Sequence, residues 1–203
     1  ETQIPIIVST GMAGDRELDD AIEVITSYHS NLSILHCVSQ YPTEPKNVNL
    51  NTIPYLLDKY KDFEIGYSDH TIGISAPVAA VALGAKIIEK HITLDRYMKG
   101  TDQIGSLGPD GVKRMVRDIR IIDKSMGTKS MFIVPDTISA KNKLERSIAT
   151  NKNLPKGHII SEEDIHLLSP GDGIKWINKN EVIGKELKSE LLKNEIIYSN
   201  TLN

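Results

Sequence analysis

Two histidines, His70 and His91, have the residue type and the surroundings in this chain that best suit catalytic chemistry. Each lies just after a short apolar run of the kind that forms a buried strand. Neutral imidazoles at the ends of neighbouring strands can point at one centre and bind a divalent cation. The alternative is that each is an ordinary hydrogen-bonded histidine at a strand end. The pair therefore predicts a metal site, and its spacing leaves the alternative open.

Three serines also stand where such apolar runs end: Ser9, Ser39 and Ser68. Hydroxyl groups and free backbone amides at strand ends suit the oxygens of a phosphate or a carboxylate. Serine is equally common in ordinary turns, so each could simply close a turn. Lys90 and Lys99 could neutralise such an anion, or they could be solvated surface lysines. We take the three serines as candidate substrate-binding residues.

Asp102 follows the last of these runs, in the stretch Gly100-Thr-Asp-Gln103. Its carboxylate could bind a sugar hydroxyl, act as an acid or a base, or cap a turn. His36 lies inside an apolar run and is therefore predicted to be a hydrogen-bonded core histidine. His158 is expected to be solvated on the surface.

Short apolar runs and helical patterns alternate along the first part of the chain. The runs are rich in β-branched residues and almost continuously apolar, as strands buried on both faces are. Strand and helix alternate four times, which is the rhythm of a parallel α/β fold, either a doubly wound sheet or a barrel. The carboxyl ends of such strands converge on one face, which would gather the polar residues named above. The predicted strands are Ile4–Val8, Leu32–His36, Phe63–Gly66 and Lys86–Glu89, and the predicted helices span 15–28, 49–61, 74–83 and 111–126.

The pattern changes after Gly127, where strong helical periodicity ends and short strand-and-turn pieces begin. Two stretches resemble each other because each places a turn before an Ile-Ile pair. They are Leu154-Pro-Lys-Gly-His-Ile-Ile160 and Leu191-Leu-Lys-Asn-Glu-Ile-Ile197. We therefore predict three parts: an α/β domain over residues 1–127, a linker over 128–145, and a small, internally repeated β module over 146–203.

The charge balance and the composition argue against several classes of partner. The chain has 203 residues, with 24 basic and 27 acidic side chains and a net charge of −3. This balance gives no electrostatic reason to expect nucleic acid or an anionic membrane as a partner. Apolar residues make up 39% of the chain, enough for a packed core, and no apolar run approaches the roughly 20 residues needed to span a bilayer. The single cysteine, Cys37, forms no internal disulfide, which is compatible with the cytoplasm, where we expect the protein.

Several longer motifs stand out in the α/β part of the chain. They are Ser9-Thr-Gly-Met, Cys37-Val-Ser-Gln-Tyr-Pro, Gly66-Tyr-Ser-Asp-His-Thr, Ala80-Val-Ala-Leu-Gly-Ala, Ile88-Glu-Lys-His-Ile-Thr-Leu-Asp95 and Gly100-Thr-Asp with Ser106-Leu. Together they resemble the sialic acid synthase family. Arg146-Ser-Ile, Pro155-Lys-Gly and Ser169-Pro-Gly-Asp-Gly-Ile resemble the antifreeze-like (SAF) domain of that family. The motifs are long, and the resemblance covers nearly the whole chain.

The resemblance implies a (β/α)8 TIM barrel with an appended SAF domain, assembled as a domain-exchanged homodimer. It implies condensation of phosphoenolpyruvate with an N-acylmannosamine or a related amino sugar, giving a nonulosonic acid and phosphate. A divalent metal ion, Mn2+ or Mg2+, would bind to His70 and His91. The residues that match the family's substrate sites are Ser39 and Ser68 around phosphoenolpyruvate, Ser9 as a further site residue, and Tyr41 and Asp102 near the sugar. Tyr41 and Asp102 are also the candidate catalytic residues.

Two departures from the family pattern bear on activity. A full barrel needs eight strands and typically about 250 residues, whereas four predicted strands precede the linker here, and they match the family's last four. The resemblance therefore implies a partner that supplies an N-terminal half-barrel, or a catalytically incomplete fragment. Ser169 stands where bacterial members often carry an arginine that reaches the partner's sugar site. A third interpretation is a carbohydrate-binding module built around the SAF domain.

Overall fold

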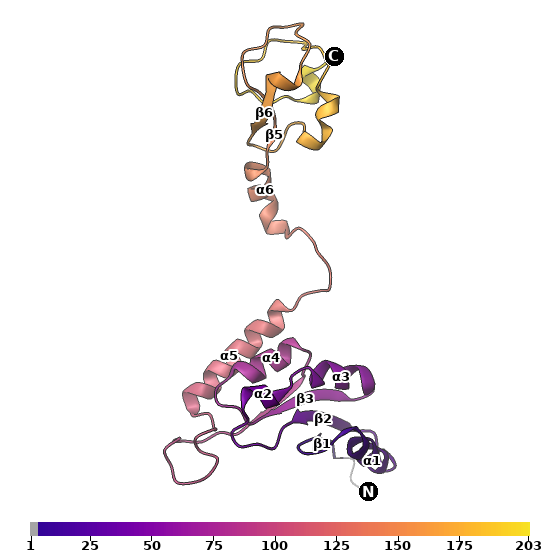
Figure 1. Cartoon of the computed structure of the whole chain (residues 1–203), viewed down its shortest axis with the longest axis vertical. Coiled ribbons are helices and arrows are strands. Elements are labelled where there is room, and N and C mark those ends of the chain that lie inside the picture. Colours follow the sequence, from indigo (N-terminus) through magenta and orange to yellow (C-terminus); the bar gives the residue numbers. More distant parts are fainter. Residues whose placement is uncertain (1–3) are drawn as a thin grey trace. The chain divides into compact units, whose positions relative to one another are not determined.

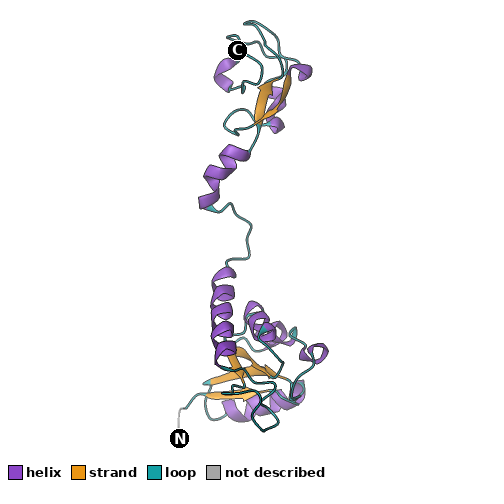
Figure 2. Cartoon of the chain, turned by 90° about the vertical axis from the view of Figure 1, so that its left-hand side faces the viewer, coloured by secondary structure: helices purple, strands orange, loops and turns teal. Residues whose placement is uncertain are grey.

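The computed structural model describes residues 4–203 and separates into two compact units. The first, which we call the barrel unit, ends at Thr128, and the second, the C-terminal unit, runs from Lys129 to Asn203. Figure 1 labels the elements of each unit along the chain, and Figure 2 shows the same chain coloured by secondary structure. Among the described residues, no helix is both long and apolar enough to cross a membrane.

Four parallel strands form the sheet of the barrel unit, in the order β1-β2-β3-β4. They are β1 (Ile6–Ser9), β2 (Leu32–Cys37), β3 (Glu64–Asp69) and β4 (Ile87–Lys90). Every predicted strand is present, so the parallel α/β prediction is confirmed, although β3 extends to Asp69 instead of ending at Gly66. Within the described residues, β1 and β4 each pair with one neighbouring strand, so both leave an open edge.

The α-helices described in this unit are α1 (Asp15–Thr26), α2 (Pro45–Val48), α3 (Thr52–Lys59), α4 (Ser75–Ala82) and α5 (Pro109–Ser125). Four of them correspond to the predicted helices. The exception is α2, which is a single turn. It begins at Pro45, and proline is favourable in the first turn of a helix. So short a helix has no room for an apolar repeat that a sequence pattern could reveal.

The helices cover one face of this sheet and form the core of the unit with it. Ile34 and Ile65 on the sheet are buried against a cluster that includes Leu18 of α1 and Ile53 of α3. Figure 1 shows these helices beside the strands. Burial of this apolar face is the main source of stability for the unit.

The opposite face of the sheet corresponds to the interior of a barrel. Because side chains alternate along a strand, Ser9, Leu35 and Ser68 lie on this face. Leu35 is fully buried, and a Cβ atom on Gly66 would lie 2.4 Å from its Cδ2 atom, so the glycine lets Leu35 lie across the neighbouring strand. Ile7 on β1, by contrast, is 55% exposed. The inner layer is therefore packed at the central strands and open at the β1 edge.

The C-terminal unit combines a short α-helix and a two-stranded antiparallel sheet with several 3-10 turns. The helix α6 (Ile138–Leu144) lies within the segment predicted as a linker, and its exposed side chains form no apolar repeat that would mark it in the sequence. The strand β5 (Ser147–Thr150) pairs with β6 (Ile165–Leu168). The 3-10 helices are η1 (Pro135–Thr137), η2 (Glu162–Asp164), η3 (Trp176–Glu181) and η4 (Ser199–Thr201).

The predicted internal repeat is confirmed, and its two copies pair with each other. The amide of Leu154 donates to the carbonyl of Leu191 at 2.8 Å, and the amide of Leu191 donates back at 2.9 Å. Two further bonds in the first copy each have an equivalent in the second. The amide of Gly157 donates to the Leu187 carbonyl, as that of Asn194 does to Thr150. The amide of Ile160 donates to the Lys185 carbonyl, as that of Ile197 does to Ile148. A 3-10 helix, η2 or η4, follows each copy. Each copy therefore satisfies backbone groups of the other, and neither forms a complete fold alone.

Candidate functional site

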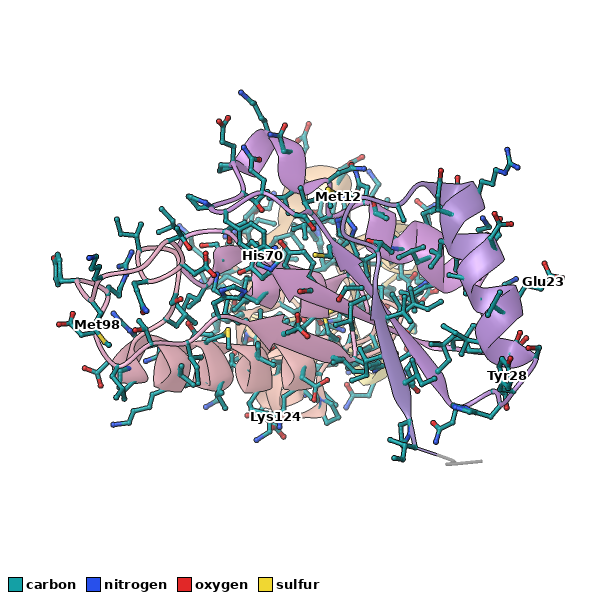
Figure 3. All side chains as sticks on the ribbon, turned by 90° about the horizontal axis from the view of Figure 1, so that it is seen from below. Met12, Glu23, Tyr28, His70, Met98 and Lys124 are labelled. Atoms are coloured by element: carbon teal, nitrogen blue, oxygen red, sulfur yellow. The ribbon has the colours of Figure 1, made fainter. Side chains whose placement is uncertain are left out.

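His70 and His91 lie next to each other at the carboxyl end of the sheet. His70 is the residue after β3 and His91 is the residue after β4, and their ring centres are 5.1 Å apart. Figure 3 shows His70 toward the same end of the sheet as Met12, which follows β1, and away from Tyr28. The structure thus brings together the two histidines whose spacing predicts a metal site.

Hydrogen bonds from other loops fix the backbone around both histidines. The carbonyl of His70 accepts a bond from the Thr43 amide at 2.9 Å, and the carbonyl of His91 accepts one from the Leu107 amide at 2.9 Å. β3 and β4 also end at the same step of their parallel pairing. The two histidines therefore lie side by side just beyond the sheet. The strand pairing before them and the bonds to their carbonyls hold their backbone in place.

One hydrogen bond orients the ring of His70. Its Nδ1 atom lies 2.9 Å from the carbonyl oxygen of Val38, the residue after β2. A carbonyl oxygen only accepts, so Nδ1 carries the proton, and the sulfur of Cys37 lies 3.8 Å from the same nitrogen. In the neutral ring this leaves the lone pair of Nε2 free to bind a cation.

Tyr41 and Asp102, the two candidate catalytic residues, share a pocket with the histidines. The ring centre of Tyr41 lies 4.1 Å from that of His70 and 5.7 Å from that of His91. The Asp102 carboxylate lies 3.8 Å from Nδ1 of His91, which is too far for a direct hydrogen bond. Pro42, Asp69, Thr101 and Gly105 complete the lining. The candidate metal ligands and the candidate sugar-binding residues therefore face one small space.

The three candidate serines are placed differently from one another. Ser68 is buried, and its hydroxyl donates to the carboxylate of Glu89 at 2.6 Å across the inner face of the sheet. The hydroxyl of Ser39 lies beside the loop after β1, where a Cβ atom on Gly11 would come within 3.0 Å of it. Ser9 is exposed at the end of β1. The serines lie outside the lining of the histidine pocket, and their role in substrate binding stays a prediction.

Lys90 pairs with a carboxylate of the protein itself, so it is neither a solvated surface lysine nor free to neutralise a substrate anion. Its Nζ atom lies 2.7 Å from Oδ2 of Asp69, and both side chains are almost fully buried. The hydroxyl of Tyr67 also donates to Asp69, at 2.9 Å. Burial, followed by the charge of Asp69, raises the pKa of Tyr67. Opposite charges at the ends of two neighbouring buried strands are the sequence signal that could have revealed this pair. Lys99, the other candidate lysine, is exposed in the loop after β4.

The remaining histidine predictions have different outcomes. The core position predicted for His36 is confirmed, because the residue is buried and its Nε2 atom lies 2.7 Å from the carbonyl oxygen of Val48. The solvated position expected for His158 is confirmed only in part, because its side chain is 31% exposed. Its Nε2 atom lies 2.8 Å from a carboxylate oxygen of Asp164, whose side chain is buried. The spacing of His158 and Asp164 along the chain does not reveal that Asp164 is buried and bonded to His158.

The histidine pair fits as part of a ligand set for a divalent cation. Two imidazoles that bind one ion through nitrogens at about 2.1 Å place their ring centres roughly 5 Å apart, which agrees with the separation of His70 and His91. Across residues 4–203, no three or more histidine, cysteine or carboxylate side chains converge as a complete ligand set. Two protein ligands would leave positions for water and substrate, as an open catalytic site requires.

Two family models match the chain, one for each part of its sequence. The NeuB family model matches residues 1–131, and the SAF domain model matches residues 145–203. These matches agree with the two groups of motifs seen in the sequence.

The chain is also similar in sequence to several named synthases. The chain is 36% identical to the N,N'-diacetyllegionaminic acid synthase of Legionella pneumophila, over 93% of this chain and 54% of that one. It is 35% identical to the N-acetylneuraminate-9-phosphate synthase of Homo sapiens, over 77% of this chain and 44% of that one. A solved structure of the N-acetylneuraminic acid (sialic acid) synthetase from Leptospira borgpetersenii, in complex with citrate, is 38% identical with a TM-score of 0.62, and the match covers 70% of this chain and 50% of that one. The chain spans about half the length of the relatives it matches.

Proposed function

The chain belongs to the NeuB family, and from that premise we propose that it carries the C-terminal half of a nonulosonic acid synthase. Such an enzyme condenses phosphoenolpyruvate with an N-acylmannosamine-type amino sugar and releases phosphate. The observation that carries the proposal is the convergence of His70, His91, Tyr41 and Asp102 at the carboxyl ends of a parallel sheet. The cytoplasm is the location expected for this reaction.

His70 and His91 would hold the divalent ion, Mn2+ or Mg2+. When bound there, the ion supplies Lewis acidity that makes the aldehyde carbon of the sugar more electrophilic. The chain itself holds the imidazoles ready for binding. The Val38 carbonyl keeps the proton of His70 on Nδ1, so that Nε2 stays available. The backbone bonds to both histidine carbonyls reduce the reorganisation that binding would otherwise require.

The remaining site residues are proposed to hold the two substrates. Tyr41 would pack against the sugar, and the Asp102 carboxylate would accept a hydrogen bond from one of its hydroxyls. Ser39 and Ser68 would contact the oxygens of phosphoenolpyruvate, and Ser9 would be a further residue of the substrate site. Holding both substrates in one orientation lowers the entropic part of the activation barrier of the condensation.

The bond changes follow from the two substrates. C3 of phosphoenolpyruvate forms a bond to the aldehyde carbon of the open-chain sugar, and the aldehyde oxygen gains a proton. Water then adds at C2 of the resulting cation and loses one proton, which balances the proton gained by the aldehyde oxygen; the proton of the new hydroxyl leaves with the phosphate. The bond from C2 to the phosphate oxygen breaks, which leaves a ketone at C2 and releases phosphate. The products are a nonulosonic acid and inorganic phosphate.

A partner segment is proposed to supply the rest of the site. β1 and β4 have open edges, Ile7 on the inner face is 55% exposed, and the chain spans about half the length of its relatives. An N-terminal half-barrel that pairs with both edges would close the barrel and cover this face. The family resemblance adds a second chain, which would form a domain-exchanged homodimer.

A condensation assay tests the proposed reaction. It combines phosphoenolpyruvate with a panel of N-acyl amino sugars, with and without a phosphate group, and measures phosphate release and product mass. We expect turnover when this chain is mixed with an N-terminal half-barrel, and none from this chain alone. No turnover in any combination would contradict the synthase function and favour the second candidate, a catalytically incomplete fragment.

Two alanine variants test the metal ligands. His70→Ala and His91→Ala should each weaken Mn2+ binding by more than about 100-fold, because each removes a ligand and not merely a neighbour of one. Calorimetry on the folded proteins measures the affinity. His29→Ala is the matched control, since His29 lies before β2, at the opposite end of the sheet. Unchanged affinity in both site variants would exclude these histidines as ligands.

A further inference from the structure

A charged pair on the sheet directly precedes the two histidines. Asp69 is the last residue of β3 and Lys90 is the last residue of β4, and the two lie opposite each other in the parallel register. The next residues along the chain are His70 and His91. Nζ of Lys90 lies 2.7 Å from Oδ2 of Asp69, and the side chains are 2% and 0% exposed. We propose that this ion pair is a positioning device that sets the separation and direction of the two imidazoles.

Hydrogen bonds use both carboxylate oxygens of Asp69. Oδ1 accepts bonds from the Tyr67 hydroxyl and from the Thr71 amide, each at 2.9 Å. Oδ2 accepts bonds from the Thr71 hydroxyl at 3.2 Å and from Lys90. Lys90 also donates to the Thr71 carbonyl. The pair therefore ties the ends of both strands to the turn that immediately follows His70.

A second bond joins the same two strands one residue earlier. The hydroxyl of Ser68 donates to Glu89, which is its register partner, at 2.6 Å. Side chains alternate along a strand, so this bond lies on the inner face and the ion pair lies on the outer face. A slip of one residue would send each of these side chains to the wrong face. The two bonds together thus fix the register immediately before the histidines.

The energetics of buried charges favour positioning over stability as the role of the pair. Removing both charges from water offsets much of their attraction, and apolar residues of similar volume are often at least as stabilising. An ion pair differs from such residues because its contacts have direction. Lys90 and Asp69 can bond to each other and to the backbone of Thr71 in only one register of β3 against β4. The specific gain is therefore the alignment of β3 with β4.

The test replaces the pair with apolar groups in the full chain, as Asp69→Leu combined with Lys90→Met. Mn2+ affinity is measured by calorimetry, and the side-chain nitrogen NMR signals of His70 and His91 are recorded without metal. We expect a lower thermal midpoint, because the Tyr67 hydroxyl and the Thr71 amide lose their acceptor on Asp69, and we expect shifted or broadened signals from both histidines. The Mn2+ affinity should fall by about 10- to 100-fold, as for other residues that orient a metal ligand.

Three single variants make the comparison specific. Ile53→Val removes a methylene from the buried core between α3 and the sheet without removing a bond of the ion pair, and it should leave the Mn2+ affinity and the histidine signals unchanged. Lys90→Arg keeps the charge and should retain most of the affinity. Lys90→Gln removes the charge and keeps a donor, and it takes the place of the double variant should that variant fail to fold.

The affinity readout rests on the proposed metal site, whereas the NMR readout does not. Unchanged affinity and unchanged histidine signals in the charge-free variant would overturn the inference. Equal changes in Ile53→Val would also overturn it, because they would reflect general destabilisation. If the unaltered chain binds no Mn2+, the proposed metal function fails, and the histidine signals alone decide whether the pair positions the rings.

Discussion

The two units of the chain bury their apolar residues in different ways. In the C-terminal unit, both copies of the repeat contribute to one core, in which Ile148, Leu154 and Ile197 are at most 1% exposed. In the barrel unit, the helix-covered face of the sheet is equally well buried, but the other face is open at β1, where Ile7 is 55% exposed. The core of the C-terminal unit is thus closed between the two copies of its repeat, whereas Met131 and Phe132, ahead of α6, are exposed. The barrel unit carries the candidate site and leaves surface for another segment.

Buried carboxylates show the same contrast between the units. Asp164 in the C-terminal unit accepts bonds from His158 at 2.8 Å, from the Ser161 amide at 2.9 Å and from Lys152 at 2.7 Å. These bonds close a turn within one copy of the repeat. Asp69 instead joins two strands just before the candidate metal ligands. A buried acid serves local stability in one unit and the geometry of a site in the other.

Asp164→Ala should have the largest effect, and it should be confined to the C-terminal unit. The change removes the buried acceptor of the Ser161 amide, the His158 ring and Lys152, so the free energy of unfolding should fall by about 3 kcal/mol. Trp176 is the only tryptophan of the chain and lies in this unit, so its fluorescence during urea unfolding measures the change.

The matched control for this change lies in the other copy of the repeat. Thr201 occupies the place that corresponds to Asp164, and its hydroxyl makes an exposed bond to the Tyr198 carbonyl. Thr201→Ala should therefore cost less than about 1 kcal/mol. Equal losses in the two variants, or an Asp164→Ala variant that also loses the helices of the barrel unit, would break the comparison between the units.

Acid should weaken the barrel unit first, through His36. Burial lowers the pKa of His36 by more than its hydrogen bond to the Val48 carbonyl raises it. The unfolded chain therefore takes up a proton before the folded one does. The stability contributed by neutral His36 is fully present above about pH 6.5 and is lost as the pH falls below that value.

The C-terminal unit should respond only at lower pH, through Asp164. Burial alone would raise the pKa of this carboxyl, but hydrogen bonds from His158, Lys152 and Ser161 outweigh it and hold the pKa well below its usual range. Its contribution is fully present above about pH 4 and is lost as the pH falls further. Circular dichroism of the helices and Trp176 fluorescence follow the two units separately. A simultaneous loss of both signals near pH 6 would contradict this order.

The smallest predicted effect concerns the turn in each copy of the repeat. Gly157 has a φ angle of 81°, and Asn194 at the matching position has one of 69°. A Cβ atom fits at Gly157, with the nearest atom 3.7 Å away, so Gly157→Ala should cost about 1 kcal/mol through backbone strain alone. Asn194→Gly should change stability by less than about 0.5 kcal/mol, because both residues tolerate this conformation. A larger loss for Asn194→Gly, measured with Trp176, would show that its side chain matters more than its φ angle.

The sequence predicted the strands and the strand-end cluster because both depend on local residue types. Apolar, β-branched runs identified all four strands of the barrel unit, and the polar residues just beyond them placed His70, His91 and Asp102 at one end of the sheet, whereas Tyr41 came from the family resemblance. Parallel strands share one carboxyl end, so a one-dimensional pattern is enough to place these groups together.

Features that depend on contacts between distant segments were not predictable in this way. The prediction ended β3 at Gly66 because Ser68 and Asp69 are polar, yet both are buried, since Glu89 and Lys90 on β4 satisfy them. The bond from His158 to Asp164 was not expected, because nothing in the neighbouring sequence indicates that Asp164 is buried. In each case the free energy of burial depends on a partner that the local pattern does not reveal.

The pairing between the two copies of the repeat also has a consequence for biosynthesis. The ribosome makes the first copy before the second, so the amides of Gly157 and Ile160 meet their acceptors only after Leu187 has emerged. Until then, Ile148 and Leu154 have no complete core to enter, and long-range closure is the slow step. The C-terminal unit should therefore fold late, with its first copy exposed to chaperones and proteases while the second copy is still being translated.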